Sequence, residues 1–67
     1  MSIARVTEIV SASPTGWKEA VDAGVARASK TLRNIVGVEV LEEKAKVEDG
    51  RIVEYRVRLK ITFVLEA

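Results

Sequence analysis

The stretch of sequence that decides the fold is residues 36–65, VGVEVLEEKAKVEDGRIVEYRVRLKITFVL. Near its centre, Asp49 and Gly50 form the dipeptide preferred at the two central positions of a type I′ turn, where both residues need a positive φ. Apolar and polar residues alternate on both sides of this dipeptide. The stretch therefore predicts one long β-hairpin that turns at residues 49–50.

Closing the hairpin at this turn pairs residues whose numbers add to 99. One face of the hairpin then becomes apolar, and the other face places carboxylates opposite basic side chains. A slip of one residue would separate these charges and turn the apolar set towards water, so both patterns favour the same register. The predicted pairs are Val40–Leu59, Val38–Ile61 and Val36–Phe63 on the apolar face, and Glu48–Arg51, Glu43–Arg56 and Glu39–Lys60 on the polar face.

The N-terminal half predicts one strand and one helix. Residues 3–10 are rich in β-branched side chains and lack a helical period, which favours a strand. Ser13 is a good helix N-cap and Pro14 suits the first helical position, so we expect a helix of about 20 residues to begin there. Its apolar residues form a single stripe that should face the sheet. The stripe consists of Trp17, Val21, Val25, Ala28, Leu32 and Ile35.

Two features of these elements predict close contacts. Gly24 lies inside the helix, where glycine costs about 1 kcal/mol relative to alanine, so another backbone should come close to it. We favour a contact with the sheet of the same chain over a contact with a helix of another subunit. The helix, at about 30 Å, is also shorter than the hairpin strands, at about 46 Å. The uncovered arm of the hairpin, with Val47 and Ile52 on the face opposite to Val40, predicts a subunit contact.

The composition also favours oligomerisation. Residues 1–67 are expected to form one domain, and a domain of this size buries only about 60% of its unfolded surface, so it usually needs disulfides, a metal or partner subunits. The sequence has no Cys and no His, which excludes disulfides and the usual zinc ligands. Its 11 basic and 10 acidic residues are well mixed, which argues against a nucleic-acid partner. We expect a cytoplasmic protein, because no run reaches the ~20 apolar residues of a membrane span and the N-terminus lacks a signal-peptide core.

The sequence does not indicate an enzyme. No residues combine a nucleophile, a base and an orienting group, and no phosphate-binding or calcium-binding loop is present. Trp17 is either a stacking platform for a planar ligand or a large side chain that closes one end of a small core, and we favour the second.

Arg56, Arg58 and Lys60 form a cationic stripe on the polar face of the last strand. This stripe either binds phosphate-bearing ligands or is a solvated face that is paired with Glu43 and Glu39. We favour the paired face. The residues alone therefore lead to a small α+β protein with the order β-α-β-β that depends on oligomerisation.

Several segments together resemble the dodecins, over essentially the whole chain. They are SPTGW at 13–17, ARASKTLRN at 26–34, VEV at 38–40, EYRV at 54–57 and ITFVLE at 61–66. The resemblance implies that a three-stranded antiparallel sheet wraps around one helix, with the first strand antiparallel to the last. It also implies that twelve copies assemble into a hollow homododecamer.

The resemblance further implies a ligand site. In flavin-binding dodecins, isoalloxazine rings stack in pairs between tryptophans of the second strand, and a glutamine of the third strand bonds the ring edge. These positions align with Gly37 and Arg56, so the implied site for riboflavin or FMN contains Val36, Gly37, Val38, Arg56 and Arg58. Gly37 lacks an aromatic face, and Arg56 donates hydrogen bonds but cannot accept them.

The chain is more similar to a dodecin subgroup without the stacking tryptophan, which is described as calcium-binding or of unsettled ligand. Three functions therefore stay open. The first is flavin storage, and the second is binding of a calcium ion or of a phosphate-bearing cofactor such as coenzyme A, with Arg56 and Arg58 at the phosphates. The third is a structural assembly with no cofactor. Metal-binding residues are not indicated.

Overall fold

The computed structural model describes residues 2–65, and within them one helix and three strands follow the order β1 (Ile3–Ser13), α1 (Trp17–Ala28), β2 (Ile35–Glu48) and β3 (Arg51–Leu65). The strands form one antiparallel sheet in the order β1-β3-β2, so the last strand of the sequence lies in the middle. This arrangement confirms the α+β class, the β-α-β-β order and the antiparallel pairing of the first strand with the last.

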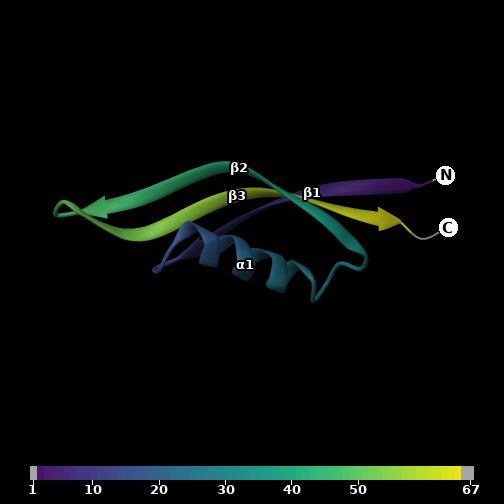
Figure 1. Ribbon diagram of the computed structural model, residues 1–67, viewed down its shortest axis with the longest axis horizontal. Coiled ribbons are helices and arrows are strands. Elements are labelled where there is room, and N and C mark those ends of the chain that lie inside the picture. Colours follow the sequence, from purple (N-terminus) through teal and green to yellow (C-terminus); the bar gives the residue numbers. More distant parts are fainter. Residues whose placement is uncertain (1, 66–67) are drawn as a thin grey trace.

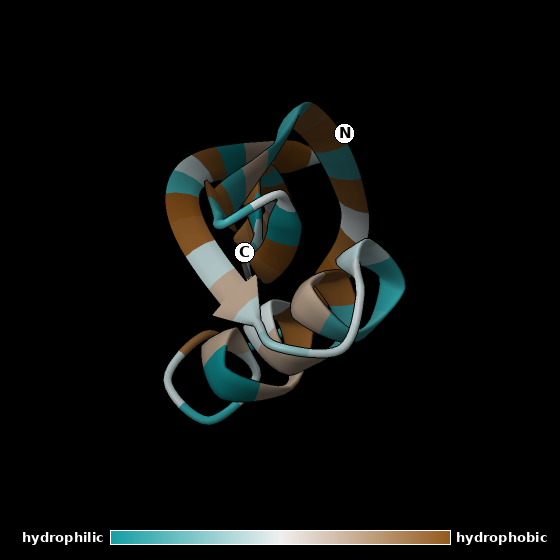
Figure 2. Ribbon diagram, turned by 90° about the vertical axis from the view of Figure 1, so that its left-hand side faces the viewer, coloured by the Kyte–Doolittle hydropathy of each residue, from teal (hydrophilic) through white to brown (hydrophobic). Residues whose placement is uncertain are grey.

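The sheet wraps around the helix. α1 lies against one face of the sheet, and the hairpin of β2 and β3 extends well beyond it (Figure 1). Viewed from the end of that hairpin, the twisted strands arch over the helix, and hydrophobic and hydrophilic residues alternate along them (Figure 2). We call the sheet face towards α1 the helix side and the other face the outer side.

The core lies between the middle strand and the helix. Leu59 and Ile61 are fully buried, and Val57 is 1% exposed. These three side chains alternate along β3 and therefore share the helix side of the sheet. From α1, the buried residues are Ala20, Gly24 and Ala28.

The predicted helical stripe was wrong in two respects. The face in closest contact with the sheet consists of the small residues Ala20, Gly24 and Ala28, whereas Val21 and Val25 lie beside it and are half-buried. The helix also ends at Ala28, so Leu32 and Ile35 lie outside it. The Ser29 hydroxyl donates a 2.8 Å hydrogen bond to the Val25 carbonyl, the kind of local side-chain bond that accompanies a helix end.

The predicted N-cap was also wrong. Ser13 is the last residue of β1, and α1 begins only at Trp17, after Gly16. The Ser13 hydroxyl instead accepts a 3.1 Å hydrogen bond from the backbone N–H of Thr15. Ser13 therefore stabilises the turn between strand and helix, because its side chain bonds two residues on rather than to the first helical turn.

The prediction for Gly24 was confirmed. A Cβ atom at this position would lie 3.0 Å from Leu59 Cδ1 and 3.1 Å from Ser11 Cβ, both in the sheet of the same chain. Glycine allows the helix axis to approach the sheet closely at this point, and the tight contact is internal to the chain.

The turn of the hairpin and most of its predicted pairs were confirmed. Asp49 and Gly50 have φ values of 52° and 75°, as a type I′ turn requires. Two predicted pairs were wrong: Glu43 lies opposite Val57, and Phe63 lies opposite Ile35 rather than Val36. The confirmed pairs are Val40–Leu59, Val38–Ile61, Glu48–Arg51 and Glu39–Lys60.

Bulges explain both errors. The register shifts between Ile35 and Gly37, between Val40 and Glu42, and between Lys46 and Val47. Leu41 is the additional residue on β2 and Val53 is the additional residue on β3, so the register changes at Leu41 and is restored before the turn. From Leu41 to the turn on β2, and from the turn to Val53 on β3, the alternation is inverted, so Val47 and Ile52 lie on the helix side. The prediction had placed them on the face opposite to Val40.

The arm is the part of the hairpin that extends past α1 and its contacts with Lys44 and Tyr55, residues 46–54. Val47 and Ile52, which lie opposite each other near its end, are 59% and 46% exposed. The predicted uncovered arm is thus present, with its apolar pair on the side that α1 covers elsewhere in the sheet.

Candidate functional site

A hollow of about 280 Å³ lies on the outer side of the sheet, where all three strands contribute side chains. Val10 comes from β1, Glu42 and Lys44 come from β2, and Arg56 and Arg58 come from β3. Charged groups therefore line most of this hollow, which we call the outer hollow.

Arg58 connects the three strands by ion pairs. Its Nη1 lies 2.7 Å from Glu8 Oε1 on β1, and its Nε lies 3.1 Å from Glu42 Oε1 on β2. The hydrogen bond from Arg58, followed by the charge of Lys44, lowers the pKa of Glu42, and the bonds to Glu42 and Glu8 raise the pKa of Arg58. All three side chains are between 42% and 51% exposed, so water screens these interactions.

The other two basic groups of the cationic stripe are also paired. Arg56 Nε contacts Glu54 Oε1 at 2.5 Å, and Lys60 Nζ lies 4.0 Å from Glu39 Oε1. The interpretation of the stripe as a paired, solvated face was thus confirmed for Lys60 with Glu39. The expected partner Glu43 was wrong, because the bulge at Leu41 places Lys44 opposite Arg56.

Gly37 lies at the other end of β2, opposite Thr62. A Cβ atom at Gly37 would meet only the Cβ of Thr62, at 3.9 Å, which is an ordinary contact. Its neighbours Val36 and Val38 are 66% and 42% exposed. Val38 lies opposite the buried Ile61 on the helix side, so its side chain points away from the face of the outer hollow.

A single chain does not bring the two halves of the predicted site together. Gly37 lies beside Thr62, and Thr62 lies six positions after Arg56 on β3. Six strand residues span about 20 Å. A ligand that contacts both Gly37 and Arg56 therefore needs these residues from different copies of the chain.

Trp17 closes the end of the core. Its ring packs beside Ala20, Val57 and Leu59, and its Nε1 donates a 3.0 Å hydrogen bond to the Lys44 carbonyl. Tyr55 meets the indole edge to face, with ring centroids 4.9 Å apart. Both the indole N–H and the ring have protein partners, which confirms the structural interpretation of this residue.

The predicted site did not include Glu8, Glu42 and Lys44, which the structure places beside Arg58 and Arg56. Glu42 and Lys44 fall on the apolar side in the continuous 99 register, and charged residues at such positions were the available signal that the register changes. Within residues 2–65 no three acidic side chains converge on one point that could hold a metal ion. The same residues contain no helix long and apolar enough to cross a membrane.

Comparison with known proteins places these features in a family. The model of the family described as Dodecin matches residues 3–66. The calcium dodecin of Mycobacterium tuberculosis is 32% identical over 63 residues, which cover 94% of this chain and 89% of that protein. The dodecin of Thermus thermophilus is 39% identical over 59 residues, which cover 88% and 86%.

Solved structures agree with the sequence relatives. The dodecin from Streptomyces davaonensis superimposes with a TM-score of 0.93 at 39% identity and covers 98% of this chain and 97% of its own. The structure of the calcium dodecin from Mycobacterium tuberculosis gives a TM-score of 0.82 at 32% identity, with 97% and 93% covered.

Proposed function

This chain belongs to the dodecin family, a family of non-enzymatic binding proteins that form homo-oligomers, and we propose that it stores a flavin, riboflavin or FMN, in a homododecameric shell. The proposed site lies at a contact between subunits. Val36, Gly37 and the main chain of Val38 of one copy form one side of it, and Arg56 and Arg58 of another copy form the other.

The observation that carries this proposal is the open surface at Gly37. The residue is unobstructed apart from the 3.9 Å approach of Thr62, and the exposed Val36 provides apolar surface beside it. A planar ring can therefore approach the backbone of β2 closely, as glycine permits. The distance of about 20 Å between Gly37 and Arg56 within one chain is the reason for assigning the two sides to different copies.

Arg56 is suited to the polar edge of such a ring. A guanidinium donates several hydrogen bonds and accepts none, so it can address the ring carbonyls. Glu54 currently holds Arg56 on an exposed surface, where an ion pair contributes only about 0–1 kcal/mol. A ligand carbonyl can replace such a partner at little cost.

Calcium is the second candidate ligand. The support is the 32% identity to a protein named calcium dodecin, together with glycine in place of a stacking aromatic residue at position 37. The glycine at position 37 alone supports a position nearer to the subgroup without that tryptophan, since the identity to the dodecin of Thermus thermophilus is 39%. A calcium ion would need oxygen ligands from more than one copy, since the described part of one chain offers no acidic cluster.

Coenzyme A has weaker support. Its phosphates would need Arg56 and Arg58, and both guanidiniums already contact carboxylates, Arg58 two of them. A phosphate would have to displace these partners or approach beside negative charge. The shell without any dedicated ligand remains the third candidate.

A titration of riboflavin and FMN with the purified protein, followed by flavin fluorescence, tests the proposal. Saturable quenching supports the flavin site, because a ring stacked in a protein contact loses its emission. No quenching at tens of micromolar flavin contradicts it. Under that second result, a melting temperature that rises with calcium or with coenzyme A identifies the corresponding alternative, and no response to either leaves the structural assembly.

A further inference from the structure

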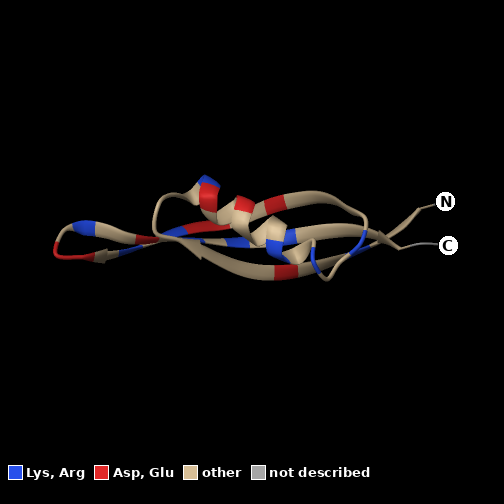
Figure 3. Cartoon of the chain, turned by 90° about the horizontal axis from the view of Figure 1, so that it is seen from below, with Lys and Arg blue, Asp and Glu red and all other residues tan. Residues whose placement is uncertain are grey.

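Ion pairs within the described chain leave charges of opposite sign without a partner at two places, the C-terminal end of α1 and the base of the arm. In the described part, residues 2–65, neither Arg27 nor Lys30 at the end of α1 has a carboxylate within 4.0 Å. At the base of the arm, Glu43 likewise lacks a basic partner in that part of the chain. Figure 3 shows basic residues at the C-terminal end of α1, and both acidic and basic residues along the arm.

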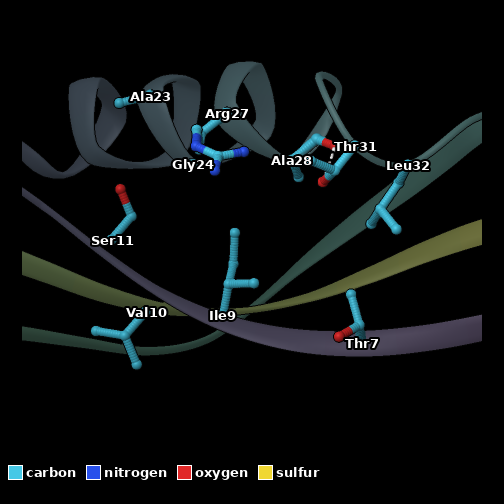
Figure 4. A pocket seen from close by; sticks show the side chains of 10 residues that line it. All are labelled: Thr7, Ile9, Val10, Ser11, Ala23, Gly24, Arg27, Ala28, Thr31 and Leu32. Atoms are coloured by element: carbon cyan, nitrogen blue, oxygen red, sulfur yellow. Dashed lines mark hydrogen bonds between the residues drawn. The ribbon is translucent and has the colours of Figure 1, made fainter.

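The basic end adjoins an apolar groove. A cavity of about 460 Å³ lies between α1 and β1, which is an edge strand of the sheet. Figure 4 shows Ile9 pointing into it from the strand and the Arg27 side chain lying over it from the helix. Thr7 and Ser11 of β1, Gly24 and Ala28 of α1, and Leu32 after the helix are among the other residues that line the groove.

The arm presents a surface of matching character. Val47 and Ile52 are exposed on its helix side, and Glu43 lies on the same side four residues before Val47. A step of four strand residues is about 13 Å. The groove extends along β1 from Thr7 to Ser11, which is also a step of four residues.

We infer that the arm of a second copy of this chain lies over the groove, with its Glu43 against Arg27 and its Val47 and Ile52 over Ile9 and Leu32. Both the charge and the apolar surface of the arm then find a complement that the single chain does not provide. The two surfaces are different, so the contact is heterologous, and a closed shell requires that its repetition around an axis closes a ring. This inference rests on the proposed assembly and adds the contact that forms it.

Charge reversal tests the contact. We expect Glu43→Arg and Arg27→Glu each to lower the assembled fraction at a protein concentration where the wild type is fully assembled, as measured by light scattering. The double variant, which carries both changes, should recover the wild-type mass. Single variants that assemble like the wild type, or a double variant no more assembled than the singles, would overturn the inference.

A matched swap separates this effect from a general change of surface charge. Lys18 and Asp22 form an exposed pair within one helix, 2.7 Å apart. The double variant Lys18→Glu with Asp22→Lys exchanges the same two charges elsewhere on the surface and should assemble like the wild type. If the wild type and every variant form a shell, the contact between arm and groove is wrong, although the proposed assembly stands. A monomeric wild type contradicts the contact and the assembly.

Engineered cysteines test the same contact without relying on charge. The chain has no native cysteine, so the double variant Glu43→Cys with Arg27→Cys offers only this pair. Within one chain the two positions lie about 15 Å apart, because Lys44 contacts Trp17 and ten helical residues separate Trp17 from Arg27. That distance prevents an internal disulfide. Mild oxidation should give covalent multimers on a non-reducing gel, and a product that stays monomeric contradicts the contact.

Discussion

The indole N–H of Trp17 donates a 3.0 Å hydrogen bond to the main-chain carbonyl of Lys44, a residue 27 positions further along the chain. The bond ties the first turn of α1 to the base of the arm. Tyr55, which lies opposite Ala45 on the paired strand, adds an edge-to-face ring contact on the same side. One helical side chain therefore connects the first turn of α1 to both strands at the base of the arm.

Trp17→Phe should lower the free energy of unfolding by about 1–2 kcal/mol, because the variant loses the bond to the Lys44 carbonyl and part of the ring volume. Urea unfolding at fixed protein concentration measures this loss. Tyr55→Phe is the matched control, since it keeps the ring contact and its hydroxyl makes no hydrogen bond within residues 2–65. Equal stability of both variants would show that the indole N–H contributes nothing.

Gly24→Val should destabilise the protein by about 2 kcal/mol. Even one added carbon would lie 3.0 Å from Leu59 Cδ1, so the larger side chain forces the helix away from the sheet, an overpacking cost of about 1–3 kcal/mol. Ala26→Val, at an exposed position of the same helix, should cost only about 0.5 kcal/mol through helix propensity. Thermal unfolding of the two variants side by side distinguishes these values; similar losses would contradict the close contact.

Glu42→Gln should change the pH dependence of stability. The bond from Arg58 holds the folded-state pKa of Glu42 below its ordinary value of 4.5, so this carboxylate stabilises the fold above that pH, and the contribution disappears as the pH falls through the folded-state pKa. The wild type should exceed the variant in stability at pH 7, and the difference should shrink steadily below about pH 4.5. Urea unfolding between pH 7 and pH 3 tests this expectation, and a constant difference across that range contradicts it.

Gly37→Trp should raise flavin affinity about fivefold or more, since each aromatic stack contributes on the order of 1 kcal/mol. The backbone accepts the change because Gly37 lacks a positive φ and its Cβ direction is open. Lys46→Trp, on the outer side of the arm, serves as a control for non-specific quenching. Unchanged affinity in a correctly assembled Gly37→Trp shell would count against a pocket at this residue.

The sequence predicted the hairpin well because its turn and its alternation are local signals. Asp49 and Gly50 determine the turn, and the pairs on either side of it follow for several residues. The bulge at Leu41 has a weaker signal, because a bulge has no turn dipeptide of its own and changes only which residues of the strand face the helix. The charges at Glu42 and Lys44, on a face expected to be apolar, reflected this change of register.

The helix was predicted with less precision. The stripe from Trp17 to Ile35 extends a helical period beyond the true end, because Leu32 and Ile35 happen to continue the spacing. A small apolar residue can be either buried or exposed, so the stripe of large residues did not include Ala20, although the cost of glycine inside a helix predicted the contact of Gly24 with the sheet. The ligand site could not be derived from the residues for another reason. Gly37 and Arg56 lie on distant parts of one chain, and a site that two copies share has no pattern in a single sequence.

The mass of the purified protein in solution tests the account most directly, because the ligand site and the contact of the arm with the groove both require a second copy. Light scattering at micromolar concentration should give about 89 kDa, the mass of twelve copies of the 7.4 kDa chain. A folded, stable monomer of 7.4 kDa at that concentration would contradict the account.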